Sequence, residues 1–423
     1  MPTRNPVRAL VVAFAAWKTF LLAIAVGSCV GVAYDTSASL ALDGVGVGNS
    51  STPTLVSRLT SWDAIYFTQI ARRGYLFEQE WAFGSGLPIA IFYLGKVLTA
   101  LGIETGGYLQ PLVGILVANA SHLLSVLVLY RLGQVVFRDA RLALVAASLH
   151  IFSPAGLFLS APYAESSFSL LSFTGHLLFA ESCRNGRRPG SRDALILLAG
   201  ISFGLATLFR SNGILNGVLF AWQFAQQLAR PVRHPMAAIR SLLVLGIGGL
   251  CVAAGSIGPQ LVAYWRFCSS APEANLRPWC QSYLPSIYTF VQEHYWNVGF
   301  LRYWTFPNVP LFLLAAPMLY ILTKSGLDQI VSSTVAHSGE ATQVAGVLQS
   351  AATAQVLLAL LAVTNYHVQV ITRLSSGSPL WYLWLARRLS SRETSDGGKG
   401  VVRFMIMYAA IQGVLFASFL PPA

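Results

Sequence analysis

The densest group of polar side chains in the sequence lies between residues 59 and 83, where acids and arginines stand among aromatic residues. Asp63 is an acid of the kind that can take a proton from an attacking hydroxyl group. Glu78 and Glu80 lie two residues apart, so both would face the same side of an extended segment. Structural alternatives exist for all three acids. Thr60 and Asp63 fit a capping box at the start of a helix, and the two glutamates could be solvated loop acids.

Two arginines lie at polar junctions between apolar runs and could bind an anion. Arg210 begins the sequence Arg-Ser-Asn-Gly, and Arg373 closes a junction that starts at Asn365. The guanidinium fork matches the oxygens of phosphate, which is the ligand we expect. The structural alternative is that these arginines bond helix-end carbonyls or reach lipid headgroups. Glu165 lies at a third junction, where an ionisable residue usually lines a cavity walled by protein.

The composition decides which kind of elements must position these residues. Of 423 residues, 55% are hydrophobic and only 10% are charged, against about 25% charged in soluble domains. The net charge of +12 is spread over short loops rather than clustered on one soluble face, so no nucleic-acid partner is expected. We predict an all-α polytopic membrane protein with about eleven transmembrane helices. The predicted spans are the apolar runs 9–34, 111–130, 142–160, 164–182, 194–210, 213–229, 240–265, 309–323, 347–366, 379–389 and 402–420.

The distribution of positive charge predicts the orientation. The segment 87–103 is apolar but contains Pro88 and Lys96, and counting it as a span would reverse everything after it. If it lies at the surface as a juxtamembrane helix, eighteen of the 28 Lys and Arg residues fall on the side of the N-terminus, as expected for cytoplasmic loops. Residues 35–110 and 266–308 then form two lumenal loops of a single membrane domain, 1–423.

Two further features fit a lumenal location of these loops. Asn49 begins a glycosylation sequon in the first loop. Cys268 and Cys280 share the second loop and could pair in an oxidising compartment. We expect no cleavable signal peptide, because the first apolar run is longer than the hydrophobic region of such a peptide.

The first lumenal loop carries the acid that we expect to act in catalysis. Residues 61–73 are predicted to form a helix that ends at Gly74, with Trp62, Tyr66 and Ile70 along one stripe. The charged residues of this stretch would together cost well over ~10 kcal/mol in hydrocarbon, so the helix should lie along the lumenal surface; they are Asp63, Arg72, Arg73, Glu78 and Glu80. The aromatic residues 295–306 precede a span. They could serve either as an interfacial anchor or as a surface that contacts a lipid-linked acceptor.

Motifs in order along nearly the whole chain carry a resemblance to a known family. They are Ser61-Trp-Asp-Ala-Ile-Tyr-Phe67, Gly74-Tyr75, Glu78-Gln-Glu-Trp-Ala-Phe83, Ser153-Pro-Ala155, Tyr163-Ala-Glu165, Arg210-Ser-Asn-Gly213, Tyr295-Trp-Asn-Val-Gly-Phe-Leu301, Pro310, Leu313-Leu-Ala-Ala-Pro317, His367, Ser376 and Pro379. On these residues the chain resembles the mannosyltransferases that add the second mannose in glycosylphosphatidylinositol (GPI) assembly, which belong to the GT-C superfamily. Gly84 to Pro88 and Leu311 depart from the family pattern, which leaves the shape of the acceptor groove open.

The resemblance implies a GT-C-like fold and an activity. Mannose would pass from dolichyl-phosphate mannose to the Man-GlcN-(acyl)PI precursor, forming an α1,6 bond in the lumen of the endoplasmic reticulum (ER). The expected partners are then the donor, the GPI precursor glycolipid and membrane lipid. A small accessory subunit of the ER membrane is a further candidate partner. The first-loop acid of this family is the presumed base, a role that transfers to Asp63. The candidate substrate-binding residues are Trp62, Tyr66, Glu78, Glu80, Tyr163, Glu165, Arg210, Asn212, Trp296, Asn297, His367 and Arg373.

We expect no metal and no cofactor, because the sequence has no P-loop, zincin His pair or D-x-D motif. One displacement by the acceptor hydroxyl would invert a β donor to an α product while Arg210 or Arg373 stabilises the departing phosphate. Another dolichyl-phosphate-sugar transferase of GPI or N-glycan assembly is the main alternative. A lipid or sugar transporter would place polar groups midway along several spans, and here only Lys18 does so.

Overall fold

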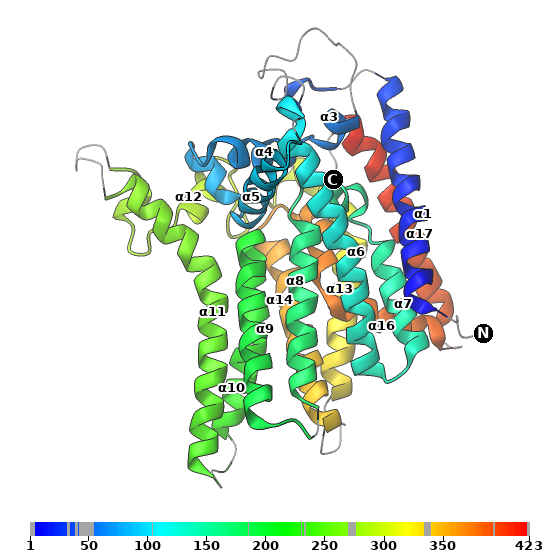
Figure 1. The fold of residues 1–423 in the computed structure, drawn as a ribbon, viewed down its shortest axis with the longest axis vertical. Coiled ribbons are helices and arrows are strands. Elements are labelled where there is room, and N and C mark those ends of the chain that lie inside the picture. The colour runs from blue at the N-terminus through cyan, green and yellow to red at the C-terminus, as the bar shows by residue number, and fades with distance from the viewer. Residues whose placement is uncertain are drawn as a thin grey trace. The chain divides into compact units, whose positions relative to one another are not determined.

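The computed structural model describes residues 5–31, 34–38, 41, 55–103, 105–184, 186–229, 231, 234–269, 276–333, 340–391 and 394–420. Every regular element within these ranges is an α-helix or a 3-10 helix (Figure 1). The predicted sequon at Asn49 lies outside the described residues.

A helix occupies each of the eleven apolar runs that the sequence predicts as spans. These helices are α1 (Pro6–Gly27), α6 (Leu109–Phe137), α7 (Ala140–Ile151), α8 (Glu165–Ser182), α9 (Pro189–Phe209), α10 (Gly217–Ala229), α11 (Pro235–Phe267), α13 (Val309–Ser333), α14 (Glu340–Thr364), α16 (Pro379–Ser390) and α17 (Ser395–Ala417). In the described part of the chain, seven helices are long and apolar enough to cross a membrane, namely α1, α6, α9, α11, α13, α14 and α17. The prediction of an all-α polytopic membrane protein is confirmed, whereas spanning by α7, α8, α10 and α16 stays a prediction.

Several boundaries differ from those predicted: α13, for example, runs to Ser333 instead of residue 323, and two helices end early. α1 ends at Gly27 and not near residue 34. α7 ends at Ile151, although its predicted span runs to residue 160. Pro154 explains the early end of α7, because proline lacks the backbone N–H and disfavours a helical conformation in the residue before it. The chain continues as a turn and the 3-10 helix η4 (Gly156–Leu159).

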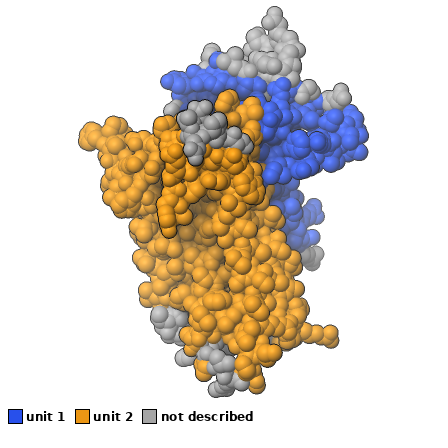
Figure 2. Space-filling view, turned by 90° about the vertical axis from the view of Figure 1, so that its left-hand side faces the viewer, with its two compact units in different colours: residues 1–74, 86–173, 372–423 blue, residues 75–85, 174–371 orange. Residues whose placement is uncertain are grey.

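The structure divides into two compact units (Figure 2). Unit 1 comprises residues 1–74, 86–173 and 372–423, and unit 2 comprises residues 75–85 and 174–371. Helix α8 begins in unit 1 and ends in unit 2.

Unit 1 contains α1, α6, α7, α16 and α17, together with α4 (Asp63–Arg73) and α5 (Gly86–Ala100). Helices α4 and α5 contact each other and the start of α6, as Figure 1 shows. At 1.5 Å per residue, the fifteen residues of α5 extend only about 22 Å, less than the roughly 30 Å of a hydrocarbon layer. This length favours the predicted juxtamembrane helix over a span.

Unit 2 is built on the close pair α9 and α11, with α10 beside them and α13 packed on α14. Glycines allow the approach of the first pair: a Cβ at Gly204 would overlap the carbonyl oxygen of Cys251, and one at Gly255 would overlap that of Gly204. Small residues let membrane helices approach closely in this way. α11 contains Pro259 and changes direction along its length in Figure 1. The short helix α12 (Ile287–His294) follows it in unit 2.

Candidate active site

The predicted first-loop helix is present as α4, and its first residue is Asp63. It ends at Arg73, and the following Gly74 has a φ of +79°, as its predicted role as a stop requires. The helix starts two residues later than expected because Trp62 has a φ of +59°, which is not helical. The capping-box alternative is wrong: the Thr60 hydroxyl donates to the Val56 carbonyl, and the side chain of the N-cap residue, Trp62, makes no capping bond.

The Asp63 carboxylate takes part in a largely buried cluster of polar and charged groups in unit 1, which we call the Asp63 cluster (Asp63, Tyr163, Glu165 and Arg373). Nη1 of Arg373 lies 3.1 Å from Oδ2 of Asp63, and its Nε lies 3.5 Å from Oε1 of Glu165. The Asp63 side chain is 35% exposed, whereas that of Glu165 is 1% exposed. Of the two acids, Asp63 is therefore the one that a substrate can reach.

Close packing of two distant segments brings Arg373 to Glu165. Arg373 lies in the single turn α15 (Ile371–Leu374), and the next turn reaches Gly377. A Cβ at Gly377 would overlap the ring of Phe168 in α8, so only glycine allows this approach. Ser172 of the same helix donates to the Gly377 carbonyl at 2.9 Å.

The electrostatics of the Asp63 cluster keep Arg373 charged. Burial would lower the pKa of Arg373, but the charges of Asp63 and Glu165 raise it above its ordinary value. The guanidinium also lies over the Phe158 ring, 4.6 Å from its centroid. Burial and the Asp63 charge raise the pKa of the Tyr163 hydroxyl, which therefore stays protonated.

Lys18, which the sequence leaves unexplained, supports the turn beside this cluster. Its ammonium donates to the Leu159 carbonyl at 2.8 Å and to the Ser160 hydroxyl at 2.7 Å. Asn119 donates to the Ser160 carbonyl at 3.1 Å. These buried bonds hold the end of η4, whose Phe158 packs against Tyr163. Lys18 thus bonds the last carbonyl of η4 and the hydroxyl that follows it inside unit 1.

Unit 2 holds a second cluster around Glu78, which lies in the 3-10 helix η2 (Glu78–Ala82). Its carboxylate accepts hydrogen bonds from Arg277, from the Trp279 indole at 3.0 Å and from the Tyr295 hydroxyl at 3.2 Å. Burial alone would raise the pKa of Glu78, but the hydrogen bonds from Arg277 and Trp279 bring it below its ordinary value. We call these four residues the Glu78 cluster.

The alternative of two solvated loop acids is wrong, because Glu78 and Glu80 are both buried. They also lie in a 3-10 helix and not on an extended segment. Glu80 accepts from the backbone N–H groups of Leu76 and Phe77, and so caps the start of η2. The contacts of both acids are therefore those of structural residues.

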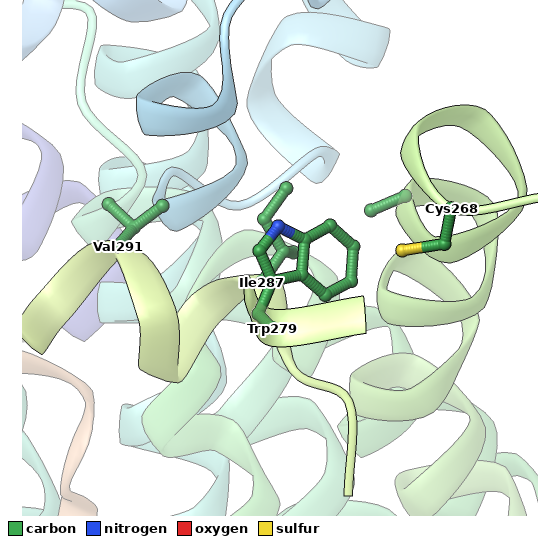
Figure 3. Packing of buried hydrophobic residues seen from close by; sticks show 5 residues of the cluster. Cys268, Trp279, Ile287 and Val291 are labelled. Carbon is green, nitrogen blue, oxygen red and sulfur yellow. The ribbon is translucent and has the colours of Figure 1, made fainter. Parts of the chain in front are cut away.

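The hydrophobic cluster next to Glu78 is held by a disulfide. Cys268 at the end of α11 is joined to Cys280, with Cα atoms 5.6 Å apart. Trp279 is buried against Ile287 and Val291 of α12, and Figure 3 shows its ring between Cys268 and Val291. The pairing that the sequence left open is thus present.

Arg210 and Asn212 lie at the start of the 3-10 helix η5 (Ser211–Asn216), where Asn212 is buried. Gly84 brings the η2 segment to this place, because a Cβ there would overlap the carbonyl oxygens of Leu208 and Phe209. The departure from the family pattern at Gly84 therefore has a structural reason in this chain.

The remaining predicted residues of unit 2 form a row of aromatic contacts. The Trp296 ring lies 5.9 Å from that of Phe83 and 6.2 Å from that of His367. Asn297 has a φ of +49°, a conformation that asparagine adopts more readily than most residues.

In unit 1, Tyr66 of α4 is exposed, while Ile70 of the same predicted stripe is buried.

Sequence reasoning missed Arg277 and Trp279 as partners of Glu78. The signal that could have found them is their place in Arg277-Pro-Trp-Cys280, directly before a cysteine for which pairing was left open. A disulfide fixes the residues beside it, so an arginine and a tryptophan next to Cys280 were candidates to bond a buried acid.

Comparison with known proteins decides the family. Residues 19–423 match the family described as Mannosyltransferase (PIG-V). The chain belongs to this mannosyltransferase family. It is 55% identical to GPI mannosyltransferase 2 of Chaetomium globosum, over 99% of this chain and 97% of that protein. Its identity to GPI mannosyltransferase 2 of Gibberella zeae is 46%, over 99% and 98% of the two chains. The resemblance found in the sequence is thus confirmed, and the chain is a glycosyltransferase.

Among solved structures, the chain is similar to the archaeal oligosaccharyltransferase AglB from Archaeoglobus fulgidus. The TM-score is 0.46 at 14% identity, over 94% of this chain and 56% of that one. ArnT from Cupriavidus metallidurans gives a TM-score of 0.44 at 13% identity, over 96% of this chain and 77% of that one.

Proposed function

We propose that this mannosyltransferase adds the second mannose in GPI assembly. The donor is dolichyl-phosphate mannose, the acceptor is the Man-GlcN-(acyl)PI precursor glycolipid, and the new bond is α1,6. The observation that carries this proposal is the identity of up to 55%, over almost the whole chain, to proteins named GPI mannosyltransferase 2. The Asp63 cluster supplies the accessible acid of the proposed reaction.

Asp63 is the base of the proposed reaction, because it is the accessible acid of its cluster. The 6-hydroxyl oxygen of the acceptor mannose attacks C1 of the donor mannose while the bond from C1 to the phosphate oxygen breaks. The hydroxyl proton passes to Asp63, and dolichyl phosphate leaves with the bonding electrons. A single displacement of this kind inverts a β donor to an α product.

The two candidate arginines receive different roles. Arg373 is already paired with Asp63 and Glu165, so one positive charge faces two negative ones in the Asp63 cluster. Such a cluster attracts an anionic leaving group poorly. We therefore assign to Arg373 the orientation of Asp63. Arg210 belongs to unit 2 and is kept as the candidate for the donor phosphate on its residue type alone, since its guanidinium matches the phosphate oxygens.

The reaction is proposed to occur in the ER lumen, with the N-terminus in the cytoplasm. The disulfide between Cys268 and Cys280 supports this, since such bonds persist in oxidising compartments. It lies in the loop 266–308, which the distribution of positive charge also assigns to the lumen. A small accessory subunit of the ER membrane remains part of the proposal.

We also propose that transfer needs no metal or cofactor, because the donor carries its own phosphate leaving group. Activity is therefore expected to survive chelation by EDTA during an assay with both lipid substrates. Loss of activity that returns with added Mg²⁺ or Mn²⁺ would contradict this part of the proposal.

The function is tested by depleting the protein in cells and following the GPI intermediates in isolated microsomes. The precursor with one mannose should accumulate, and added protein should convert it to the form with two. Accumulation of a later GPI intermediate or of a truncated N-glycan donor would instead support a different dolichyl-phosphate-sugar transferase.

A further inference from the structure

The residue before Asp63 has a backbone conformation that a bulky side chain rarely adopts. Trp62 has a φ of +59° and a ψ of −128°, in a region that glycine favours. Such conformations persist only where the surrounding structure holds them, and they cluster at functional sites. Some group must therefore hold the turn at Trp62.

The Tyr163 hydroxyl is that group, because it bonds the backbone on both sides of Trp62. It accepts a hydrogen bond from the Asp63 N–H at 3.0 Å and donates one to the Ser61 carbonyl at 3.2 Å. A single hydroxyl thus spans the turn and satisfies the first N–H of α4, whose N-cap residue makes no side-chain capping bond.

The Tyr163 side chain is itself fixed and closed to solvent. It is fully buried, and its ring contacts those of Phe67, Phe158 and Phe416 with centroids 4.9 to 6.1 Å away. A side chain held in this way is suited to positioning a neighbour. It offers no surface to a substrate, which argues against the substrate-binding role predicted for Tyr163.

We propose that Tyr163 is a positioning residue that holds Asp63 in its reacting orientation by clamping the turn at Trp62. This inference rests on the proposed role of Asp63 as the base. Two attachments then orient the acid: the Tyr163 hydroxyl fixes its backbone, and Arg373 fixes its carboxylate. Without the first, the backbone at Trp62 relaxes and the carboxylate moves away from the acceptor hydroxyl.

The test is the variant Tyr163→Phe, which removes both hydrogen bonds and keeps the ring. Displacement of a catalytic group by about 1 Å can reduce a rate about 100-fold. We expect kcat per folded enzyme to fall about 10- to 100-fold, with the KM of both substrates unchanged. The pH profile of kcat should keep its shape, because Tyr163 transfers no proton. Tyr382→Phe is the matched control, a tyrosine of α16 that is equally buried in unit 1, and its kcat should match the wild type.

A double-mutant cycle separates this proposal from the one on which it rests. In the Asp63→Asn background, Tyr163→Phe should cause no further loss of rate. An equal loss in both backgrounds, an unchanged kcat or a raised KM would each overturn the positioning role. Full activity of Asp63→Asn alone would instead contradict the proposed role of Asp63 as the base.

A second variant covers the case in which Tyr163→Phe does not fold. 4-Aminophenylalanine at position 163 keeps an N–H donor for the Ser61 carbonyl and the size of the ring. It should fold and retain part of the wild-type kcat, with the KM of both substrates unchanged. A folded 4-aminophenylalanine variant with fully wild-type pH dependence but a raised donor KM would show a substrate contact and overturn the proposal.

Discussion

Replacing Glu78 with glutamine is expected to loosen the Glu78 cluster. The glutamine amide cannot accept at both positions, so one bond from Arg277 is lost and the bond from the buried Trp279 indole is no longer charge-assisted. Arg277 is 44% exposed, so its ion pair contributes no more than about 1 kcal/mol. With the weakened bonds from Trp279 and Tyr295, the local destabilisation should be about 2–3 kcal/mol.

Hydrogen exchange measures this loss directly, because the cluster holds α12. A change of about 2–3 kcal/mol corresponds to exchange that is about 30- to 150-fold faster in the amides of residues 287–294. Glu293→Gln is the matched control, since the Glu293 pair with Arg302 spans 3.9 Å between half-exposed side chains. Equal protection in the two variants would refute the anchoring role. A raised acceptor KM of Glu78→Gln without faster exchange would restore Glu78 as a substrate ligand.

Three further outcomes are expected. The pKa of Glu78 is lowered in the fold, so its stabilisation should be complete above the ordinary glutamate pKa of about 4.3. This stabilisation should be lost as the pH falls through the lower folded-state pKa of Glu78. The measurement is hydrogen exchange at residues 287–294 in the wild type and in Glu78→Gln at each pH. A difference in exchange between the two proteins that does not change with pH would contradict the prediction. Gly84→Ala should destabilise the protein by about 1–3 kcal/mol, because its Cβ would overlap backbone oxygens. Gly400→Ala, with open space around it, should not lower the melting temperature, and equal melting of the two variants would refute the packing argument. Arg210→Gln should raise the donor KM, and Arg373→Lys should lower kcat. Steady-state kinetics with varied dolichyl-phosphate mannose measure both. A lowered kcat for Arg210→Gln together with a raised donor KM for Arg373→Lys would contradict the assigned roles.

The helices could be predicted from the sequence because their signals are local. Apolar runs are sufficient to locate helices: all eleven predicted runs contain an α-helix, and seven of the described helices are long and apolar enough to cross a membrane. The end of α4 at Gly74 could also be predicted, since a glycine commonly follows the last residue of a helix. The start of α4 was not, because the positive φ of Trp62 depends on the Tyr163 hydroxyl, which is 100 residues from Asp63.

The partners of the charged groups could not be predicted, because they lie far along the chain. Arg373 is 310 residues from Asp63, and Arg277 is 199 residues from Glu78. Residue types suggested which groups could do chemistry, and the junctions between spans suggested where. The sequence also does not show that Asp63 is accessible and Glu165 is buried, because this depends on how α8 packs against the turn at Gly377.

The central claim is that Asp63 takes the proton of the acceptor hydroxyl. Single-turnover transfer by Asp63→Asn, with both lipid substrates saturating and the amount of folded enzyme determined, tests it most directly. A general base typically contributes 10²- to 10⁴-fold, so the rate should fall by at least about 100-fold. Transfer by the asparagine variant at the wild-type rate would contradict the account.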